Sequence, residues 1–377
     1  MGTLPYVLAP SRAATLLMVA AVAAACGTST PNNVASHSHS PAASASPSAS
    51  PYSQPASSPS PPTITGAYGV LYGSQAASTY RVNIIGVDGK VVASAQVSTP
   101  PLPSCANSAA AVVSPPVSTT NTRVYFEDAQ GTIHYLGPNG DTGTATTAPA
   151  PTGSRRAMFA VSPDDARIAV VVDDFNSSGA STRLYVENLS GGGDHLDLFT
   201  QTGAFSLWPV GWHGTNNLVL AKVPSCRQGV GVGGNSIIEY HVVDPATATR
   251  RFTIGGTNCG LSLSDPSPAG VVCENPPNAI ILSWTDTALR TYAIQGPIGA
   301  YLSPNGSNVA FVDNIGTTFT NGGSAMSGVF ACVWIDDGHV LAGGDFQHQA
   351  RIGSISDASI VPVPAQGDCG GRLPGGL

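Results

Sequence analysis

Short apolar runs separated by tight turns recur along the chain from residue 65 to its end. The stretch 159–174, which reads F-A-V-S-P-D-D-A-R-I-A-V-V-V-D-D, shows the unit most fully. Two apolar runs flank a Ser-Pro-Asp-Asp turn, and two carboxylates follow. Proline at the second turn position and Asp after it favour a type I turn. Because no stretch carries a long 3.6-residue period, the domain is predicted to be all-β.

The unit repeats about seven times. Apolar runs preceded by turns lie at 68–72, 123–126, 167–172, 217–221, 270–273, 308–312 and 339–342. Further strands and hairpins bring each repeat to about four strands. One four-stranded sheet cannot bury both of its faces, whereas a closed ring of sheets can. We therefore predict a β-propeller of seven four-stranded blades, with six or eight as alternatives. We expect the seven runs to be the innermost strands, and 159–161 to be the outermost strand of the preceding blade.

Two repeats carry a specific resemblance. S-P-D-D-A-R-I-A-V-V-V at 162–172 and S-P-N-G-S-N-V-A-F-V at 303–312 resemble the S-P-D-G-x-x-I-A-F repeat of TolB-like, WD40-type propellers. The other repeats match in outline, and none has the G-H…W-D pair of typical WD40 repeats. The resemblance implies a propeller with binding as its usual activity. It implies no substrate, because propellers host many unrelated functions.

The N-terminal region predicts export. Residues 1–25 read as a signal peptide: the apolar run 13–25 follows Arg12 and is short for a membrane span. Small residues before Cys26 resemble the lipobox of bacterial lipoproteins, although Ala23 stands where that family usually has Leu. We expect Cys26 to be lipidated; the alternative is cleavage after Ala25 with Cys26 left as a thiol. Residues 26–64, rich in Ser, Pro and Ala, are predicted to form a disordered linker, and 65–377 the propeller.

Cysteine parity agrees with lipidation. The chain has seven cysteines, and removing Cys26 leaves an even number, which an exported protein can pair. The six candidates are Cys105, Cys226, Cys259, Cys273, Cys332 and Cys369. We expect Cys226–Cys259 within one blade, Cys105–Cys369 across the ring closure and Cys273–Cys332 as the remaining pair. The absence of any C-x-x-C argues against zinc.

Carboxylates follow several of the repeated runs. They are Glu127, Asp128, Asp173, Asp174, Glu274, Asp313 and Asp345. If the runs are innermost strands, their ends converge on one mouth of the channel and form an acidic funnel for a cation, a metal or a basic peptide. The alternative is that these residues only begin hairpin turns. The spacing specifies no metal, and we expect no metal or cofactor.

The net charge and the context of a glycine-rich motif argue against several classes of partner and cofactor. The net charge of -7 argues against nucleic acid and anionic lipid headgroups as partners. The G-x-G-x-x-G at 229–234 leads into a predicted strand, not a helix, and is expected to be a loop.

Taken together, the signal peptide, the linker and the propeller predict a monomeric lipoprotein on the outer face of the bacterial cytoplasmic membrane or the cell surface. The propeller would be a non-enzymatic platform that binds an envelope protein or a small ligand. If the acidic funnel forms, this partner is expected to be cationic. The alternative is an envelope enzyme acting on glycans or peptides through the mouth carboxylates.

Replacing Cys26 tests the anchor. Cys26→Ala removes the only thiol that the lipobox resemblance nominates for acylation, so we expect the variant to leave the membrane fraction. Fractionation of cells followed by immunoblotting measures the distribution. Retention equal to that of the wild type would contradict lipidation at this residue.

Overall fold

The computed structural model describes residues 63–377 except 106–108, 228–236, 257–258, 262–265, 295, 297–298 and 346. The predicted signal peptide, Cys26, the predicted linker up to residue 62 and the glycine-rich segment 229–234 lie outside these residues. The described residues belong to one unit, Ser57–Leu377. They form strands and turns, and none forms an α-helix. In this part of the chain there is accordingly no helix long and apolar enough to cross a membrane.

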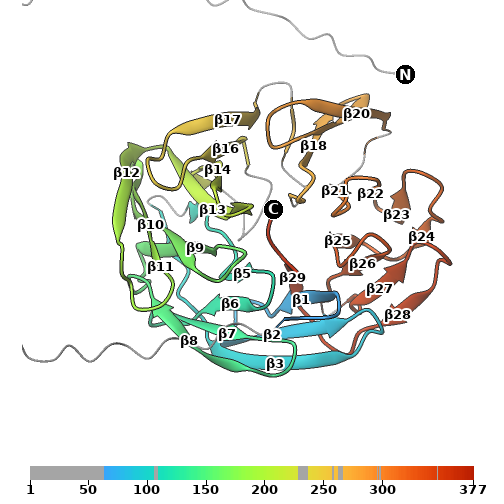
Figure 1. Ribbon diagram of the computed structural model, residues 1–377, viewed down its shortest axis with the longest axis horizontal. Helices are drawn as coiled ribbons and strands as arrows, with labels where there is room; N and C mark the ends of the chain where they lie inside the picture. Colours follow the sequence, from blue (N-terminus) through green and yellow to red (C-terminus); the bar gives the residue numbers. More distant parts are fainter. Residues whose placement is uncertain are drawn as a thin grey trace, which may run out of the picture. The chain divides into compact units, whose positions relative to one another are not determined.

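Seven sheets form a ring (Figure 1), which confirms the predicted seven-bladed propeller. From the innermost strand outward, blade 1 contains β29 (Asp368–Leu373), β1 (Tyr68–Tyr72), β2 (Thr79–Gly86) and β3 (Val91–Ser98), and blade 2 contains β5 (Val117–Thr119), β6 (Val124–Glu127), β7 (Thr132–Leu136) and β8 (Thr142–Thr147). In the same order, blade 3 contains β9 (Arg155–Val161), β10 (Arg167–Asn176), β11 (Gly179–Asn188) and β12 (Leu196–Gly203). Blade 4 contains β13 (Phe205–His213), β14 (Asn217–Pro224), β16 (Glu239–Val243) and β17 (Arg250–Gly255).

The remaining blades continue the ring. Blade 5 contains β18 (Val271–Asn275), β19 (Asn278–Leu282) and β20 (Ala288–Ala293), and a bridge between Gly260 and Glu274 adds a fourth segment. Blade 6 contains β21 (Gly299–Leu302), β22 (Val309–Val312), β23 (Gly316–Phe319) and β24 (Met326–Ser327), and blade 7 contains β25 (Ala331–Trp334), β26 (His339–Ala342), β27 (Arg351–Ser354) and β28 (Ile360–Pro362). A separate pair, β4 (Ala110–Ala111) with β15 (Cys226–Arg227), joins the segment before blade 2 to blade 4.

The position of the repeated runs within the blades differs from the prediction. Six of the runs are the second strands of their blades, and the run 270–273 takes the second place through the bridge between Gly260 and Glu274. Residues 159–161 belong to β9, which pairs with β10 in the same blade through partners such as Phe159 and Val170. The expectation that these two strands lie in neighbouring blades is therefore wrong. The reason is ring closure: the C-terminal β29 supplies the inner strand of blade 1, which moves every later strand one place outward.

The predicted turns form at both Ser-Pro sites. The Asp165 N–H donates to the Ser162 carbonyl at 2.9 Å, and the Gly306 N–H donates to the Ser303 carbonyl at 2.9 Å. The fourth residue of each turn has a positive φ, 58° at Asp165 and 74° at Gly306. Asp and Gly tolerate this left-handed conformation better than most residues. Each turn joins the first and second strands of one blade.

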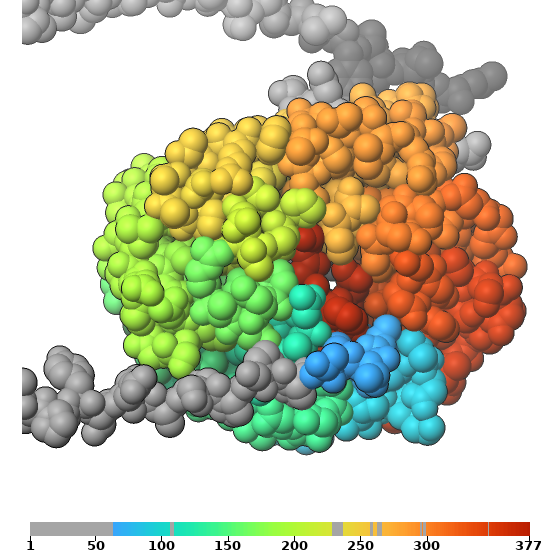
Figure 2. All heavy atoms as spheres, viewed as in Figure 1, coloured from blue at the N-terminus to red at the C-terminus, as the bar shows by residue number. Residues whose placement is uncertain are grey.

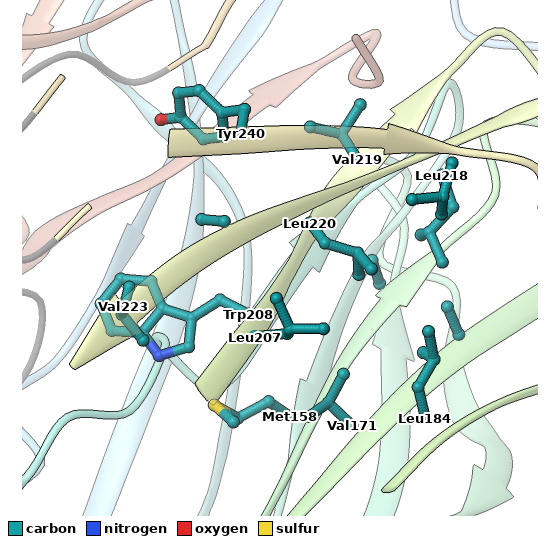
Figure 3. Close-up of a cluster of buried hydrophobic side chains, with 14 of the residues drawn as sticks. Met158, Val171, Leu184, Leu207, Trp208, Leu218, Val219, Leu220, Val223 and Tyr240 are labelled. Carbon is teal, nitrogen blue, oxygen red and sulfur yellow. The ribbon is translucent and has the colours of Figure 1, made fainter. Parts of the chain in front are cut away.

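The core lies between neighbouring blades. Figure 3 shows side chains from blades 3 and 4 packed together, including Met158, Leu184 and Leu220, all at most 2% exposed. Tryptophans also connect the inner strands. Trp212 Nε1 on β13 donates to the Ala160 carbonyl on β9 at 3.1 Å, and Trp334 Nε1 on β25 donates to the Tyr301 carbonyl on β21 at 2.9 Å. Each indole thus fills space between two blades while its polar atom is paired.

All six candidate cysteines form three disulfides, as predicted, but with different partners. The bonds join Cys105 to Cys226, Cys259 to Cys273, and Cys332 to Cys369. The expected pairs Cys226–Cys259, Cys105–Cys369 and Cys273–Cys332 are therefore wrong. Cys369 on β29 meets Cys332 on β25 because blade 1 adjoins blade 7 once the ring closes. The bond holds β29 against blade 7, and the seam between the two ends of the domain is closed by the pairing of β29 with β1.

Loop length predicts which disulfide stabilises the domain more. Cys105–Cys226 spans 121 residues of sequence, whereas Cys259–Cys273 spans 14. The chain-entropy relation makes the longer bridge worth about 2 kcal/mol more. We expect Cys105→Ser/Cys226→Ser to lower the free energy of unfolding by about that much more than Cys259→Ser/Cys273→Ser. Urea unfolding followed by circular dichroism measures both, and equal losses would contradict the expectation.

Candidate ligand-binding site

A cavity of about 200 Å³ occupies the middle of the ring. Its walls come from inner strands β5, β9, β13, β25 and β29, so blades far apart in sequence contribute to one space. Figure 2 shows a narrow opening near the middle of the ring, beside the C-terminal residues in dark red. Apolar side chains including Val117, Phe159 and Trp208 form much of the lining. Among the described residues that line the cavity, Arg372 is the only one with a charged side chain.

The C-terminal segment holds its position in the channel by backbone hydrogen bonds. The Gly375 N–H donates to the Thr120 carbonyl at 2.6 Å, and the Leu377 N–H donates to the Trp212 carbonyl at 2.9 Å. Gly371 has φ of 111°, and a Cβ there would lie 2.9 Å from Thr119 Oγ1. The glycine therefore lets β29 approach β5 closely. These contacts bring Gly375 and Leu377 into the cavity wall.

A second, more polar cavity of about 540 Å³ lies on blade 3, over β10, β11 and β12. Its charged residues include Arg155, Asp174 and Arg183. Arg155 donates through Nε to Asp174 Oδ1 at 2.8 Å and through Nη2 to Oδ2 at 3.0 Å. Both oxygens of Asp174 are thereby engaged. The carboxylate is consequently neutralised by a fixed cation and is a poor candidate for a general base.

The predicted carboxylates lie together on one face but not at the channel. All seven stand on or just after second strands, which run in the same direction in every blade. Their strand ends therefore share a face, one strand outside the ring of inner strands. None of the seven lines the central cavity, and Asp174 alone among them lines one of the cavities described above. The premise that they follow innermost strands is wrong.

Three of the exposed or half-exposed carboxylates cap their own turns. Asp128 accepts from the Gln130 and Thr132 N–H groups at 2.9 Å and contacts His134 Nε2 at 2.9 Å. Asp313 accepts from the Ile315 N–H at 2.7 Å, and Asp345 accepts from two N–H groups of its turn at 2.7 Å. These are the contacts that turn-forming Asp residues make. Glu274, in contrast, is half-buried, and burial raises its pKa.

Two of the carboxylates are fully buried. Asp173 accepts a hydrogen bond from Thr182 Oγ1 at 2.6 Å and another from the Ser206 hydroxyl. Burial raises its pKa to about 6 despite these bonds. Glu127 faces the buried Arg156, with Nη2 and Oε2 3.5 Å apart, and burial raises the pKa of Glu127 to about 7. Both carboxyl groups are buried within the fold and are not exposed to a ligand.

Sequence reasoning did not identify Arg372 or Arg156. Arg372 stands in Gly-Gly-Arg-Leu near the C-terminus, and no local pattern marks it. Its position in the channel depends on β29 closing the ring. Arg156 could have been suspected from the pair Arg155-Arg156 in an otherwise apolar strand, since alternate residues of a strand face opposite ways. The described residues include no group of three His, Cys, Asp or Glu side chains placed to hold a metal ion.

Comparison with known proteins gives likenesses of overall structure. No family model matches the sequence, and no curated protein matches it. One similar solved structure is a protein of unknown function from Bacteroides caccae, with a TM-score of 0.38 and 10% identity over 81% of this chain and 98% of that one. Another is Sqt1 from Saccharomyces cerevisiae, with a TM-score of 0.38 and 10% identity over 80% of this chain and 87% of that one.

Buried Asp173 predicts a pH dependence of stability. Its folded pKa of about 6 exceeds the unfolded value of about 3.9, so the folded protein holds a proton that the unfolded chain releases. This group therefore stabilises the fold most below pH 4, and stability falls by about 3 kcal/mol as the pH rises to 6 and above. We expect Asp173→Asn, which cannot ionise, to remove this part of the fall and to leave the part due to buried Glu127, whose pKa of about 7 is also raised.

The neighbouring carboxylate provides a control. Asp174 is half-exposed and paired with Arg155, so Asp174→Asn should change the free energy of unfolding by less than about 1 kcal/mol and keep the pH profile. Urea unfolding at intervals from pH 4 to pH 7.5 compares the three proteins. If the free energy of unfolding changes with pH in the same way for Asp173→Asn and the wild type, ionisation of Asp173 does not destabilise the fold and the prediction is wrong.

Proposed function

We propose that the protein is an exported lipoprotein of the bacterial cell envelope that presents its propeller as a non-enzymatic binding platform. The central cavity supports this proposal most directly, because inner strands of several blades enclose a space of ligand size around one charged side chain. Three disulfides are compatible with a location outside the cytoplasm. The lipobox resemblance at Cys26 and the TolB-like repeats support the anchor and the binding role.

The linker suits such a role. Residues 27–64 carry no Lys, Arg, Asp or Glu, and 38 residues of flexible chain would span roughly 35 Å as a coil. A propeller tethered at Cys26 could then reach partners beyond the membrane surface. In this proposal the membrane is contacted through the lipid alone.

The arrangement of carboxylates favours binding over the enzyme alternative. Acid/base hydrolysis of a glycan uses two carboxyl groups that face one bond, roughly 5 to 10 Å apart. Asp174 is the one predicted carboxylate that lines a described cavity, and Arg155 engages both of its oxygens. Asp173, its neighbour on β10, is buried among hydroxyl donors. Among the described residues that line the two cavities, Asp174 is the one carboxylate side chain, so neither lining supplies a pair that faces one bond.

The acidic face remains part of the proposal as a surface for a cationic partner. Asp128, Asp174, Glu274, Asp313 and Asp345 lie toward the same face and are at least partly exposed. The turn contacts of Asp128, Asp313 and Asp345 engage some lone pairs but leave the negative charge in place, whereas Arg155 offsets the charge of Asp174. A basic peptide would be attracted to this face by several weak interactions rather than by one fixed site.

Neutralising two of these residues tests the acidic face. Asp313→Asn/Asp345→Asn keeps side-chain oxygens that can cap the turns but removes two charges. We expect binding of a decalysine peptide to weaken about fivefold at low salt, because each exposed pair contributes up to about 0.5 kcal/mol. Fluorescence anisotropy of the labelled peptide measures the affinity.

A matched control uses the opposite face. Asp88 follows β2, a third strand, and third strands end on the face opposite to the ends of second strands. Asp88→Asn should leave decalysine binding within twofold of the wild type. If all three proteins bind decalysine equally, the acidic face is not the cationic-partner surface.

A further inference from the structure

Arg372, which is partly buried, has no carboxylate partner among the described residues, in contrast to the buried Arg123 and Arg156. Arg123 contacts Asp141 at 2.6 Å, and Arg156 faces Glu127. In the described part of the chain, no carboxylate lies within ion-pair distance of Arg372. Its Nη2 donates to the Gly376 carbonyl at 3.5 Å, which is long for this type of bond.

The guanidinium of Arg372 is partly removed from solvent and has few protein partners. A guanidinium has five N–H donors, and Gly376 accepts from one of them. Burial lowers the pKa of Arg372, and Asp337 opposes this effect from a distance. Asp337 is itself occupied, because it accepts from the Asn305 N–H at 2.9 Å. An anion placed against Arg372 would offset the desolvation of the guanidinium.

The position of Arg372 gives an anion room to bind. The residue lies on β29 and lines both the central cavity and a small neighbouring cavity of about 20 Å³. The central cavity exceeds the engineered protein cavity of about 150 Å³ that accepts benzene. A ligand somewhat larger than one aromatic ring would therefore fit.

The other residues that line the cavity indicate that most of the ligand is apolar. Val117, Phe159, Trp208 and Val333 offer apolar surface, which a small inorganic anion would leave without contact. Ser118 lines the same space, and its Oγ accepts from the Val161 N–H at 3.1 Å, so its hydroxyl proton can still be donated. One cationic side chain and several hydroxyl groups among apolar walls suit a molecule with an acidic end and an apolar end.

We propose that the central cavity binds a small organic acid, with its carboxylate on Arg372 and its apolar body against the channel walls. Arginine recognises carboxylates through two parallel N–H···O bonds, which sets the orientation of the ligand. The inference rests on the proposed binding function and names the ligand class of the central site. This site is separate from the acidic face.

Isothermal titration calorimetry on the full, disulfide-bonded chain tests the inference. The probes are benzoate, acetate and inorganic phosphate at constant ionic strength. We expect benzoate to bind at least tenfold more tightly than acetate or phosphate, because it alone has an apolar body. Arg372→Gln should weaken benzoate binding at least tenfold. Arg81→Gln is the matched control in the same blade, since Arg81 is exposed and donates to Gln96 Oε1 at 3.0 Å; its affinity should stay within twofold of the wild type.

A measurement on the wild-type protein tests the inference even if the Arg372→Gln variant does not fold. Benzoate should slow phenylglyoxal modification of Arg372, read by peptide mass spectrometry, and leave the rate at Arg81 unchanged. Absence of benzoate binding, equal binding by folded Arg372→Gln, or phosphate binding as tight as benzoate binding would each overturn the inference. If decalysine binding and membrane retention persist in that case, the organic-acid site fails while the proposed platform stands.

Discussion

The pairing of β29 with β1 is the interaction on which the rest of the domain depends. Tyr68 pairs with Leu373 and Tyr72 pairs with Asp368, so the two ends of the domain form neighbouring strands of one blade. A ring of sheets buries both faces of every blade only when it is closed. Closing so long a loop costs entropy, which the β1–β29 pairing must offset, while the Cys332–Cys369 bond holds β29 against blade 7.

Ring closure and the candidate site use the same short strand. β29 carries Cys369, which is bonded to blade 7, and Arg372, which lines the central cavity. Gly371 lets the strand approach β5 closely enough to enclose that cavity. A change in this strand would therefore affect both stability and any ligand bound in the channel, which is why the channel experiments include a measurement on the unaltered protein.

The carboxylates divide according to burial. Asp313 and Asp345 cap surface turns and keep their charge in solvent, whereas Asp173 and Glu127 are buried against polar partners. Glu127 also lies at a junction of blades, since its carbonyl accepts the Tyr80 hydroxyl of blade 1 at 2.6 Å while its carboxylate faces Arg156 of blade 3. A single sequence pattern thus contains residues of the surface and residues of the core.

Local chemistry by itself determined the strands, the Ser-Pro turns, the number of repeats and the number of disulfides. These follow from apolar periodicity, from the backbone preferences of Pro, Asp and Gly, and from cysteine parity. The tertiary structure alone decided which strand is innermost, which cysteines pair, and that Arg372 rather than a carboxylate faces the channel. Each of these depends on contacts between distant segments, such as Cys105 with Cys226 and Tyr68 with Leu373. Such contacts arise from closing the ring, and no local pattern of residues encodes them.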